Sequence, residues 1–395
     1  MVRYQILALN HISSHGLHRL PAARYTVGKS VVEPDAILVR SFDMHAMTIP
    51  DSVRAIGRAG AGTNNIPVAR MSERGVPVFN APGANANAVK ELVLAALLMA
   101  ARNIVPALRF VGSLDANAPD LAKHVEDAKK QFAGVELPGR TLGVVGLGAI
   151  GGLVADTALK LGMKVIGFDP EITVEAAWRL PSAVRKAQSL EELLKQSDFV
   201  TLHLPLNERT RHLIDASRLA GMKPGAALLN FARDAIVDEA AVAAALRAGT
   251  IKHFLCDFPS AALAGLPNAG MLPHLGASTA EAEENCATMV VDQVREYLEN
   301  GTIANAVNFP DVEMPRESPF RVAIANANVP NMLGQISTAM ARAGLNIHTM
   351  VNKSRGGMAY TLVDADSAID DGTIRAIAAI DGVLSVRAIP RLDDA

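Results

Sequence analysis

The chain is poor in cysteine, in aromatic residues and in charge of one sign. Its 395 residues include two cysteines and one tryptophan, and 38 basic side chains against 40 acidic ones leave a net charge of −2. Two cysteines, Cys256 and Cys286, are too few for a disulfide framework and are not spaced as a metal pair, which favours a reducing compartment and no metal. Without a basic excess a nucleic-acid partner is not expected, so the predicted ligand is a small molecule.

Long hydrophobic runs are also missing. The longest, Leu92 to Ala101, covers about half of the ~20 residues that cross a bilayer, and charged residues bound it. The first ten residues lack the basic region and the cleavage site of a secretory signal. We therefore expect a cytoplasmic protein with no membrane partner, in which Leu92–Ile104 forms a long helix.

Apolar side chains are plentiful and occur in short runs. With 50% hydrophobic and 20% charged residues, the chain has enough apolar surface for two or three domains of ordinary size. Runs such as Ala36–Val39 and Val76–Phe79 alternate with helical stretches, the rhythm of a parallel sheet covered on both faces. A second α/β unit is clearer, with five β-rich runs at Thr141–Val145, Lys164–Phe168, Phe199–Leu204, Ala226–Asn230 and His253–Asp257.

The C-terminal part begins after a predicted helix over Ser278–Asn300, with Ser278 as its N-cap and Glu281 as the capping-box partner. Three prolines in residues 310–319 predict an extended linker. The runs that follow read strand, helix, strand, strand, helix, strand, the ferredoxin-like βαββαβ order. The predicted fold is thus α/β, with two doubly wound (Rossmann-like) domains and a ferredoxin-like domain.

A glycine-rich turn carries the first chemistry. Gly146, Gly148 and Gly151 form a G-x-G-x-x-G between a predicted strand and a predicted helix, where the backbone can approach a pyrophosphate at the positive helix end. Asp169 ends the next strand, where a carboxylate accepts the ribose hydroxyls of NAD and repels a 2′-phosphate. No arginine follows it directly, so NAD is favoured over NADP.

Several further motifs resemble those of the D-isomer-specific 2-hydroxyacid dehydrogenase family. In the second α/β unit they are Asn230–Asp234, Cys256–Asp257 and Pro273–Thr279. In the first unit Leu38–Ser41, Gly57–Asn65 and Phe79–Pro82 look like the substrate-domain motifs of its phosphoglycerate-oxidising branch. Asn328–Pro330 and Gly344–Ile347 are similar to an ACT regulatory domain.

The resemblance implies NAD-dependent oxidation of D-3-phosphoglycerate to 3-phosphohydroxypyruvate, a step of L-serine biosynthesis. Removal of hydride from a hydroxy acid needs a base for the hydroxyl proton and a cation for the carboxylate. His274 and Arg233 suit these tasks, since imidazole titrates near physiological pH and guanidinium grips a carboxylate bidentately.

The resemblance also implies a division of the chain and further site residues. Residues 1–90 with 280–308 would bind the substrate, 91–279 would bind NAD, and a linker over 309–319 would lead to an ACT-like regulatory domain over 320–395. The implied cofactor residues, of which Asp257 would hold the carboxamide, are Gly146, Gly148, Ala149, Ile150, Gly151, Asp169, Phe231, Ala232, Asp257 and Gly276. Candidates for the substrate's phosphate and carboxylate are Arg40, Ser41, Arg58 and Asn80, with weaker support for Lys129 or Lys130.

In the ACT-like part, Asn326, Asn328 and Asn346 fall where an L-serine effector would be held between paired domains. Asn331 stands where the pattern has glycine. The apolar helix Leu92–Ile104 and the edge of the ACT-like domain both favour a homo-oligomer, a dimer or a tetramer.

One departure from the family is the absent acid that normally pairs with the catalytic histidine. Its position, five residues after Asp257, holds Ala262, and no Asp or Glu occurs from Phe258 to Ala280. His274 could work alone, a carboxylate from another segment or subunit could substitute, or catalysis could be impaired; we expect an active enzyme. The alternatives are a dehydrogenase for another 2-hydroxy acid, such as glyoxylate or hydroxypyruvate, and a non-catalytic protein that senses NAD and an amino acid.

Overall fold

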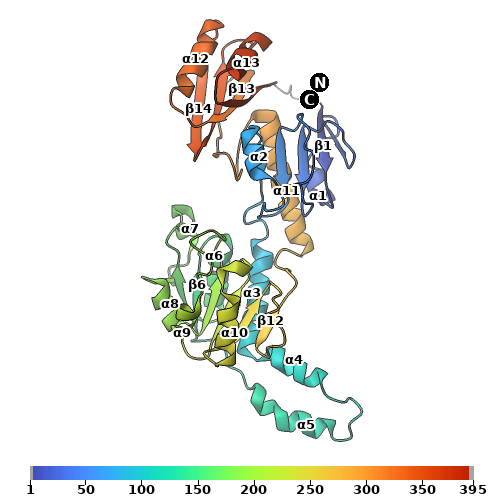
Figure 1. The fold of residues 1–395 in the computed structure, drawn as a ribbon, viewed down its shortest axis with the longest axis vertical. Coiled ribbons are helices and arrows are strands. Elements are labelled where there is room, and N and C mark those ends of the chain that lie inside the picture. The colour runs from blue at the N-terminus through green and yellow to red at the C-terminus, as the bar shows by residue number, and fades with distance from the viewer. Residues whose placement is uncertain (1–2, 391–395) are drawn as a thin grey trace. The chain divides into compact units, whose positions relative to one another are not determined.

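The computed structural model describes residues 3–390, so Met1, Val2 and the last five residues of the predicted ACT-like segment lie outside it. The chain divides into two compact units (Figure 1). Unit 1 combines Met1–Asn85 with Ala280–Ala395, and unit 2 is Ala86–Thr279.

Unit 1 contains a parallel five-stranded sheet in the order β2-β1-β3-β4-β5. Its strands are β1 (Tyr4–Ala8), β2 (Tyr25–Gly28), β3 (Ala36–Val39), β4 (Ala55–Arg58) and β5 (Val78–Phe79), and its helices are α1 (Ser14–Leu17), α2 (Val68–Glu73) and α11 (Ala280–Asn300). Helix α11 packs so closely on β4 that a Cβ at Gly57 would lie 2.8 Å from Val290. The prediction that α11 starts after Ser278 is wrong, because the helix begins at Ala280 and its preceding residue is Thr279.

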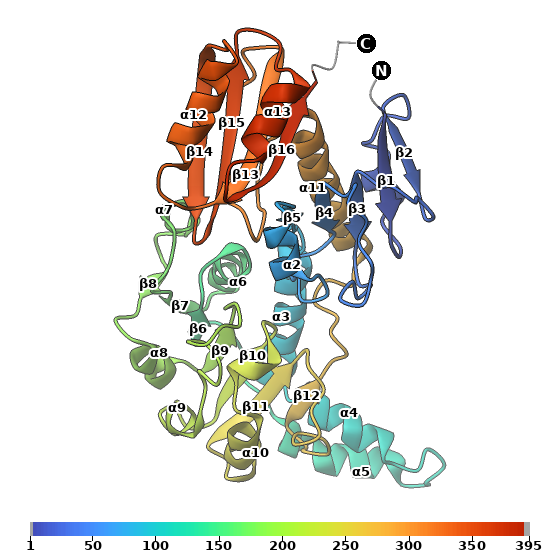
Figure 2. The ribbon, with the colours of Figure 1, turned by 45° about the horizontal axis from the view of Figure 1, so that its top comes forward.

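The C-terminal part of unit 1 is an antiparallel four-stranded sheet in the order β14-β15-β13-β16. Its elements are β13 (Phe320–Ala327), α12 (Met332–Arg342), β14 (Ile347–Arg355), β15 (Met358–Ala365), α13 (Asp371–Ala378) and β16 (Val383–Ile389). This confirms the predicted ferredoxin-like order, with α12 and α13 together on one face of the sheet (Figure 2).

The two faces of this sheet have different neighbours. Val322 and Ile324 of β13 point to α12 and α13, while the alternate residues Ala323 and Ala325 belong to the core that contains α11. The predicted linker is extended, but it is not loose. Its Val312 and Met314 are buried, and Val312 pairs through its backbone with Ile303.

Unit 2 is built on a parallel seven-stranded sheet in the order β12-β11-β10-β9-β6-β7-β8. Its strands are β6 (Thr141–Val145), β7 (Lys164–Phe168), β8 (Arg185–Lys186), β9 (Phe199–Leu202), β10 (Ala226–Asn230), β11 (Ile251–Cys256) and β12 (Ala269–Met271). Its helices are α3 (Ala86–Ala101), α4 (Ile104–Gly112), α5 (Leu121–Ala128), η1 (Lys129–Phe132), α6 (Ala149–Lys160), α7 (Val174–Arg179), α8 (Leu190–Gln196), α9 (Ala216–Ala220), η2 (Asp234–Ile236) and α10 (Glu239–Arg247). The predicted doubly wound fold is confirmed, and its strand order reverses between β6 and β9, where such folds bind ligands.

The prediction of one continuous helix over Leu92–Ile104 is wrong. Helix α3 begins at Ala86 and ends at Ala101, and the chain breaks at Asn103, which adopts the left-handed conformation with φ 52°. The Nδ2 of Asn103 donates to the carbonyl of Ala133 at 2.7 Å, and its Oδ1 lies 2.8 Å from His253 Nε2. These contacts with distant residues hold Asn103 in the left-handed conformation, which asparagine adopts more readily than most residues, and the helix therefore ends before it.

Helices α4 and α5 extend from the body of unit 2 (Figure 1). They expose apolar side chains at Leu108, Val111 and Val125. Among the described residues no single helix is long and apolar enough to span a membrane, and α3 and α4 reach that length only as a pair bent by 70°.

Candidate active site

The glycine-rich turn joins β6 to α6 and is tightly packed at two of its three glycines. Gly146 has φ +89°, and a Cβ there would lie 2.4 Å from the carbonyl oxygen of His203. A Cβ at Gly151 would lie 1.9 Å from the carbonyl oxygen of Gly146. At Gly148 a Cβ would meet nothing within 4 Å, so the turn has open space beside the first amides of α6. That space and those amides fit the pyrophosphate of a dinucleotide.

Asp169 follows β7 and lies beside this turn. Its Oδ2 accepts the N–H of Leu147 at 2.8 Å, and its Oδ1 accepts the N–H of Glu171 at 3.0 Å. The carboxylate therefore orders the glycine-rich turn and remains able to accept further hydrogen bonds from ribose hydroxyls. Ala149 and Ile150 form the first turn of α6 directly beyond Gly148.

Arg233 lies in the loop after β10, and Asn230 shapes that loop. The buried Asn230 donates from Nδ2 to the carbonyl of Arg233 at 2.8 Å and accepts the N–H of Ala232 at 3.2 Å. Phe231 and Ala232 are buried, whereas the side chain of Arg233 is exposed and donates to the carbonyl of Ala232 at 2.7 Å. The loop thus presents a guanidinium at the carboxyl end of a central strand, where ligands bind in such folds.

Asp257 ties the loop of Arg233 to the loop of His274. Its backbone N–H donates to the carbonyl of Asn230, the last residue of β10, at 3.3 Å, and its own carbonyl accepts the N–H of His274 at 3.1 Å. Its buried carboxylate accepts the N–H groups of Leu275 and Gly276, each at 2.7 Å. The family resemblance implied that Asp257 holds the nicotinamide carboxamide, and the structure adds that this carboxylate holds the histidine loop.

His274 is exposed and has φ 59°, a left-handed conformation that non-glycine residues rarely adopt. Its ring meets the ring of Phe258 edge-on, with 5.2 Å between centroids. In unit 2, all of whose residues are described, no carboxylate lies within ion-pairing distance of this imidazole. The missing family acid is therefore not replaced by another acid of this unit.

The loop that carries Ala262 is held by a different carboxylate. The hydroxyl of Ser260 donates to Glu239, the first residue of α10, and accepts the N–H of Ala262 at 3.3 Å. Ala262 is exposed, while Leu263 is buried and anchors the loop. Sequence reasoning did not single out Glu239, because only the fold brings it to this loop.

His203 is a second residue that sequence reasoning missed. It follows β9 beside the glycine-rich turn, its Nε2 lies 3.0 Å from Thr201 Oγ1, and its Nδ1 is buried without a hydrogen-bond partner among the described residues. Burial lowers the pKa of His203 to about 3, so its imidazole is neutral at physiological pH. A histidine at the carboxyl end of the predicted strand Phe199–Leu204 was the available signal.

The four candidate substrate residues lie at the carboxyl edge of the sheet in unit 1. Arg40 and Ser41 follow β3, Arg58 ends β4 and Asn80 follows β5, and these strands are neighbours. The Nε of Arg58 donates to the carbonyl of Arg40 at 3.1 Å, and Asn80 donates to the carbonyl of Ala61. The fold thus brings together residues that are far apart in sequence.

Arg40 has a partner that sequence reasoning missed. Its Nη1 lies 2.7 Å from Oε1 of Glu283, in the first turn of α11, with both side chains partly exposed. An anionic substrate group at Arg40 would compete with this carboxylate. Lys129 and Lys130 lie in η1 of unit 2, and Lys129 is paired with Glu126.

The three candidate effector asparagines do not converge within one chain. Asn326 and Asn328 lie at the end of β13 that pairs with Met358, whereas Asn346 precedes the end of β14 that pairs with Ala365. Asn326 is buried and its Oδ1 has no hydrogen-bond partner among the described residues. A site that uses all three would need a second copy of the chain.

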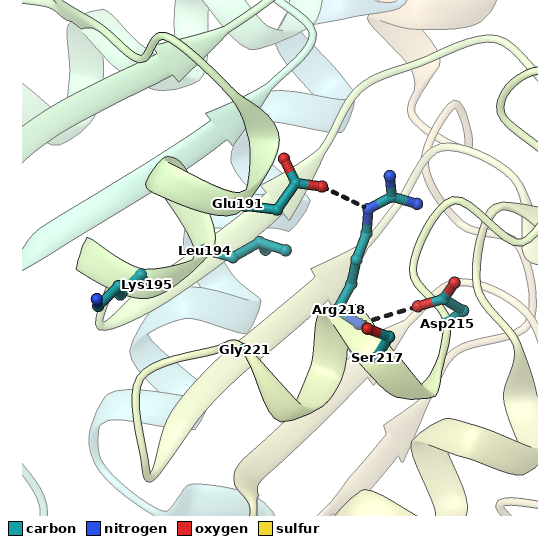
Figure 3. Close-up of a pocket in the computed structure, with 7 residues that line it drawn as sticks. All are labelled: Glu191, Leu194, Lys195, Asp215, Ser217, Arg218 and Gly221. Atoms are coloured by element: carbon teal, nitrogen blue, oxygen red, sulfur yellow. Dashed lines mark hydrogen bonds and ion pairs between the residues drawn. The ribbon is translucent and has the colours of Figure 1, made fainter.

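Two other pockets of unit 2 contain few or none of the candidate site residues. A groove of about 350 Å³ runs between α8 and α9, and its Arg218 is already paired with Glu191 at 3.2 Å (Figure 3). An apolar pocket of about 290 Å³ lies between α3, α4 and β11, and Phe231 is the one predicted site residue that lines it.

Comparison with known proteins agrees with this geometry. Residues 94–276 match the NAD binding domain of the D-isomer specific 2-hydroxyacid dehydrogenases. The chain is 33% identical to D-3-phosphoglycerate dehydrogenase of Haemophilus influenzae over 85% of its own length and 81% of that protein. It belongs to the D-isomer-specific 2-hydroxyacid dehydrogenase family, as the sequence motifs predicted.

Within that family the chain is similar to proteins named D-3-phosphoglycerate dehydrogenase. The relative from Methanocaldococcus jannaschii is 35% identical over 80% of this chain, and the chain spans 59% of its length. Among solved structures, the TT0316 protein of Thermus thermophilus matches 77% of this chain and 99% of its own with a TM-score of 0.62 and 30% identity. The prediction of NAD as the cofactor agrees with the matched domain.

Proposed function

We propose that the protein oxidises D-3-phosphoglycerate to 3-phosphohydroxypyruvate with NAD, a step of L-serine biosynthesis. The observation that carries this proposal is the connection between the loops after β10 and β12, in which Asp257, directly after β11, ties the loop of Arg233 to the loop of His274. A base and a carboxylate-binding cation on such loops suit hydride removal from a 2-hydroxy acid. The proposed cytoplasmic location follows from the cysteine content, and Cys256 and Cys286 are free and buried.

Each residue has a distinct task in this reaction. NAD, held by the glycine-rich turn and Asp169, would supply the acceptor for the hydride of the substrate carbon. Arg233 binds the substrate carboxylate through its fork of N–H donors and draws charge toward it. His274 accepts the hydroxyl proton as that oxygen becomes a carbonyl, and returns a proton in the reverse direction. Asp257 keeps the two loops in register, which preserves the spacing that proton transfer requires.

The residues proposed to hold NAD are those of the glycine-rich turn with its flanking residues. Gly146, Gly148, Ala149, Ile150 and Gly151 would surround the pyrophosphate, and Asp169 would accept the ribose hydroxyls. Phe231, Ala232, Asp257 and Gly276 would lie on the nicotinamide side. The open space at Gly148 and the carboxylate of Asp169 support this assignment.

The first part of unit 1 is proposed to bind the rest of the substrate. Arg40, Ser41, Arg58 and Asn80 would contact its phosphate and carboxylate, with residues 1–90 and 280–308 as the substrate domain and 91–279 as the NAD domain. The shared sheet edge of these four residues supports the assignment. Substrate phosphate would have to displace Glu283 from Arg40.

Regulation and assembly complete the proposal. The segment 320–395, reached through the linker 309–319, would act as an ACT-like regulatory domain that binds L-serine through Asn326, Asn328 and Asn346 between two copies. The separation of these asparagines along the sheet supports a site shared by copies. The exposed apolar side chains of α4 and α5 support a homo-oligomer, a dimer or tetramer.

A second candidate is a non-catalytic protein that binds NAD and an amino acid. It is favoured by Ala262 at the position of the family acid and by the lack of a carboxylate beside His274 in unit 2. Its weakness is that a sensor needs neither a base nor a carboxylate-binding arginine.

A substrate panel separates these candidates. Purified protein is incubated with NAD and, separately, with D-3-phosphoglycerate, D-glycerate and D-lactate while NADH absorbance is followed. Turnover of phosphoglycerate with the highest kcat/KM supports the proposal, and preference for an unphosphorylated acid would assign another 2-hydroxy acid. Binding of NAD without turnover of any acid would support the sensor. Inhibition by added L-serine tests the regulatory part.

A further inference from the structure

Unit 1 contains a cavity of about 450 Å³ that lies away from the candidate substrate residues. Arg54, which lines it, directly precedes β4, whereas the candidate Arg58 ends that strand. Val76, which also lines it, precedes β5, whereas Asn80 follows that strand. The cavity is therefore at the amino edge of the parallel sheet, and the candidate substrate residues are at the carboxyl edge.

The charged groups around this cavity are mainly cationic. Three arginines line it, Arg54, Arg74 and Arg387, against one carboxylate, Asp51. Asp51 pairs with Arg74 at 3.3 Å, but its side chain is fully exposed and so is screened by water. Burial raises the pKa of Tyr297 and of Tyr360, the two phenols of the lining, so neither supplies a negative charge. Asp35, which is not part of the lining, pairs with Arg54, so two carboxylates face three guanidinium groups and a net positive charge remains.

Two of the guanidinium groups are fixed in place by backbone carbonyls. Arg387 lies 4.4 Å above the Tyr297 ring and donates from Nη1 to Leu298 at 3.0 Å, while its Nε is buried without a partner in the described part of the chain. Arg74 donates to the carbonyls of Ile49 and Pro50. Carbonyl contacts orient a guanidinium without neutralising its charge.

Arg54 is the most available of the three cations. Its side chain is 46% exposed, and its ion pair with Asp35 is long, at 3.5 Å. It approaches the cavity from the first sheet, whereas Arg387 comes from β16 of the four-stranded sheet. Ser385 of β16 and Gly75 also line the cavity, and the hydroxyl of Ser385 donates to the carbonyl of Gly75 at 3.1 Å.

We propose that this cavity binds a small oxyanion, the phosphate or carboxylate group of a metabolite, which bridges the five-stranded and four-stranded sheets of unit 1. Guanidinium forks match both groups in geometry and charge. A ligand held by Arg54 and Arg387 together would tighten the contact between the two sheets and thereby stabilise unit 1, by an amount that grows with the logarithm of the ligand concentration above its Kd. This site is separate from the proposed catalytic reaction and does not depend on it.

The test is calorimetric titration of the full chain with two probes, inorganic phosphate and malonate. We expect saturable binding of at least one probe, and the tighter probe identifies the preferred oxyanion. Arg54→Gln and Arg74→Gln should each weaken that binding about tenfold, the effect of losing one charge-assisted hydrogen bond. The matched control is Arg70→Gln, one turn earlier in α2, where Arg70 donates to Met47 at 3.1 Å and does not line the cavity. It should change the affinity less than twofold.

Phosphate could instead bind at the candidate substrate residues, so Arg58→Gln is titrated as well. Binding that is weakened by Arg58→Gln but unchanged by Arg54→Gln and Arg74→Gln overturns the proposal, as does the absence of saturable binding of both probes. Thermal melting checks that each variant folds. Arg54 is partly exposed with one long ion pair, so its variant decides the outcome if Arg74→Gln does not fold.

Discussion

Replacing Asp257 by asparagine tests how the histidine loop is held. The carboxylate accepts two backbone N–H groups at 2.7 Å, from Leu275 and Gly276. Asparagine has nearly the same shape, but its one carbonyl oxygen can serve only one of them, and its amide N–H₂ then faces the other donor. The substitution therefore removes one charge-assisted hydrogen bond and converts the other to a neutral one.

The structure allows an estimate of the cost. Hydrogen bonds to a charged group contribute about 1.5–3 kcal/mol each and neutral ones about 1 kcal/mol, so Asp257→Asn should lower the free energy of unfolding of unit 2 by about 3 kcal/mol. For a unit of this size that corresponds to a fall in Tm of about 6–12 °C. Because the loop also positions His274, kcat/KM should fall by about 100-fold.

Differential scanning calorimetry and the NADH assay measure these two effects. The matched control is Asp215→Asn, since Asp215 caps α9 by accepting only the N–H of Arg218 at 2.9 Å and asparagine caps helices equally well. The control should change the unfolding free energy by less than about 0.5 kcal/mol. If Asp257→Asn melts and turns over like the wild type, the carboxylate does not hold the loop.

Three further predictions concern the cofactor turn and unit 1. The structure has room for the methyl group of Gly148→Ala, so this variant should fold normally. It should bind NAD at least tenfold more weakly, because the methyl group enters the proposed pyrophosphate space; unchanged affinity in a fluorescence titration with NADH would place the pyrophosphate elsewhere. Arg321 and Asp364, both fully buried, pair at 2.7 Å, so Arg321→Leu should destabilise unit 1 by about 3–5 kcal/mol in denaturant unfolding. Adding Asp364→Leu removes the unpaired charge but should recover only part of the loss, because Arg321 also donates to the carbonyls of Asn300, Met314 and Pro315; a double variant no more stable than Arg321→Leu contradicts this. Burial alone would raise the pKa of Asp364, but hydrogen bonds from Arg321 and from the N–H of Glu317 lower this pKa overall. The carboxylate of Asp364 therefore stabilises the fold above its unfolded pKa of about 4, and this stabilisation is lost as the pH falls through the lower folded pKa. A Tm that stays constant between pH 5 and pH 2 would refute this prediction.

The sequence predicted the central strands well because they are buried on both faces. The bounds of β6, β7 and β10 agree with the apolar runs, since a strand covered by helices on both sides needs continuous hydrophobic residues. The short edge strands β8 and β12 were not predicted. Their two and three residues carry little periodicity, and they exist because a neighbouring strand offers hydrogen bonds.

What the sequence could not show depends on contacts between distant residues. The helix break at Asn103 requires the carbonyl of Ala133 and the ring of His253, neither of which is near it in the chain. The pairing of Arg40 with Glu283 likewise depends on α11 returning to the first sheet. Local sequence patterns identified Arg40 as a candidate, but only the fold identified Glu283 as the carboxylate that would compete with an anionic substrate for it.

The role of His274 is tested by comparing His274→Gln with the wild type in two measurements, kcat and the dissociation constant of NADH. Glutamine preserves hydrogen bonding but cannot take up the hydroxyl proton. We predict that kcat for D-3-phosphoglycerate falls by about 10²–10⁴-fold, the usual contribution of a general base, while the dissociation constant of NADH changes by less than about threefold. A variant that retains wild-type kcat would contradict the central claim that this imidazole, without a paired acid in unit 2, performs the proton transfer.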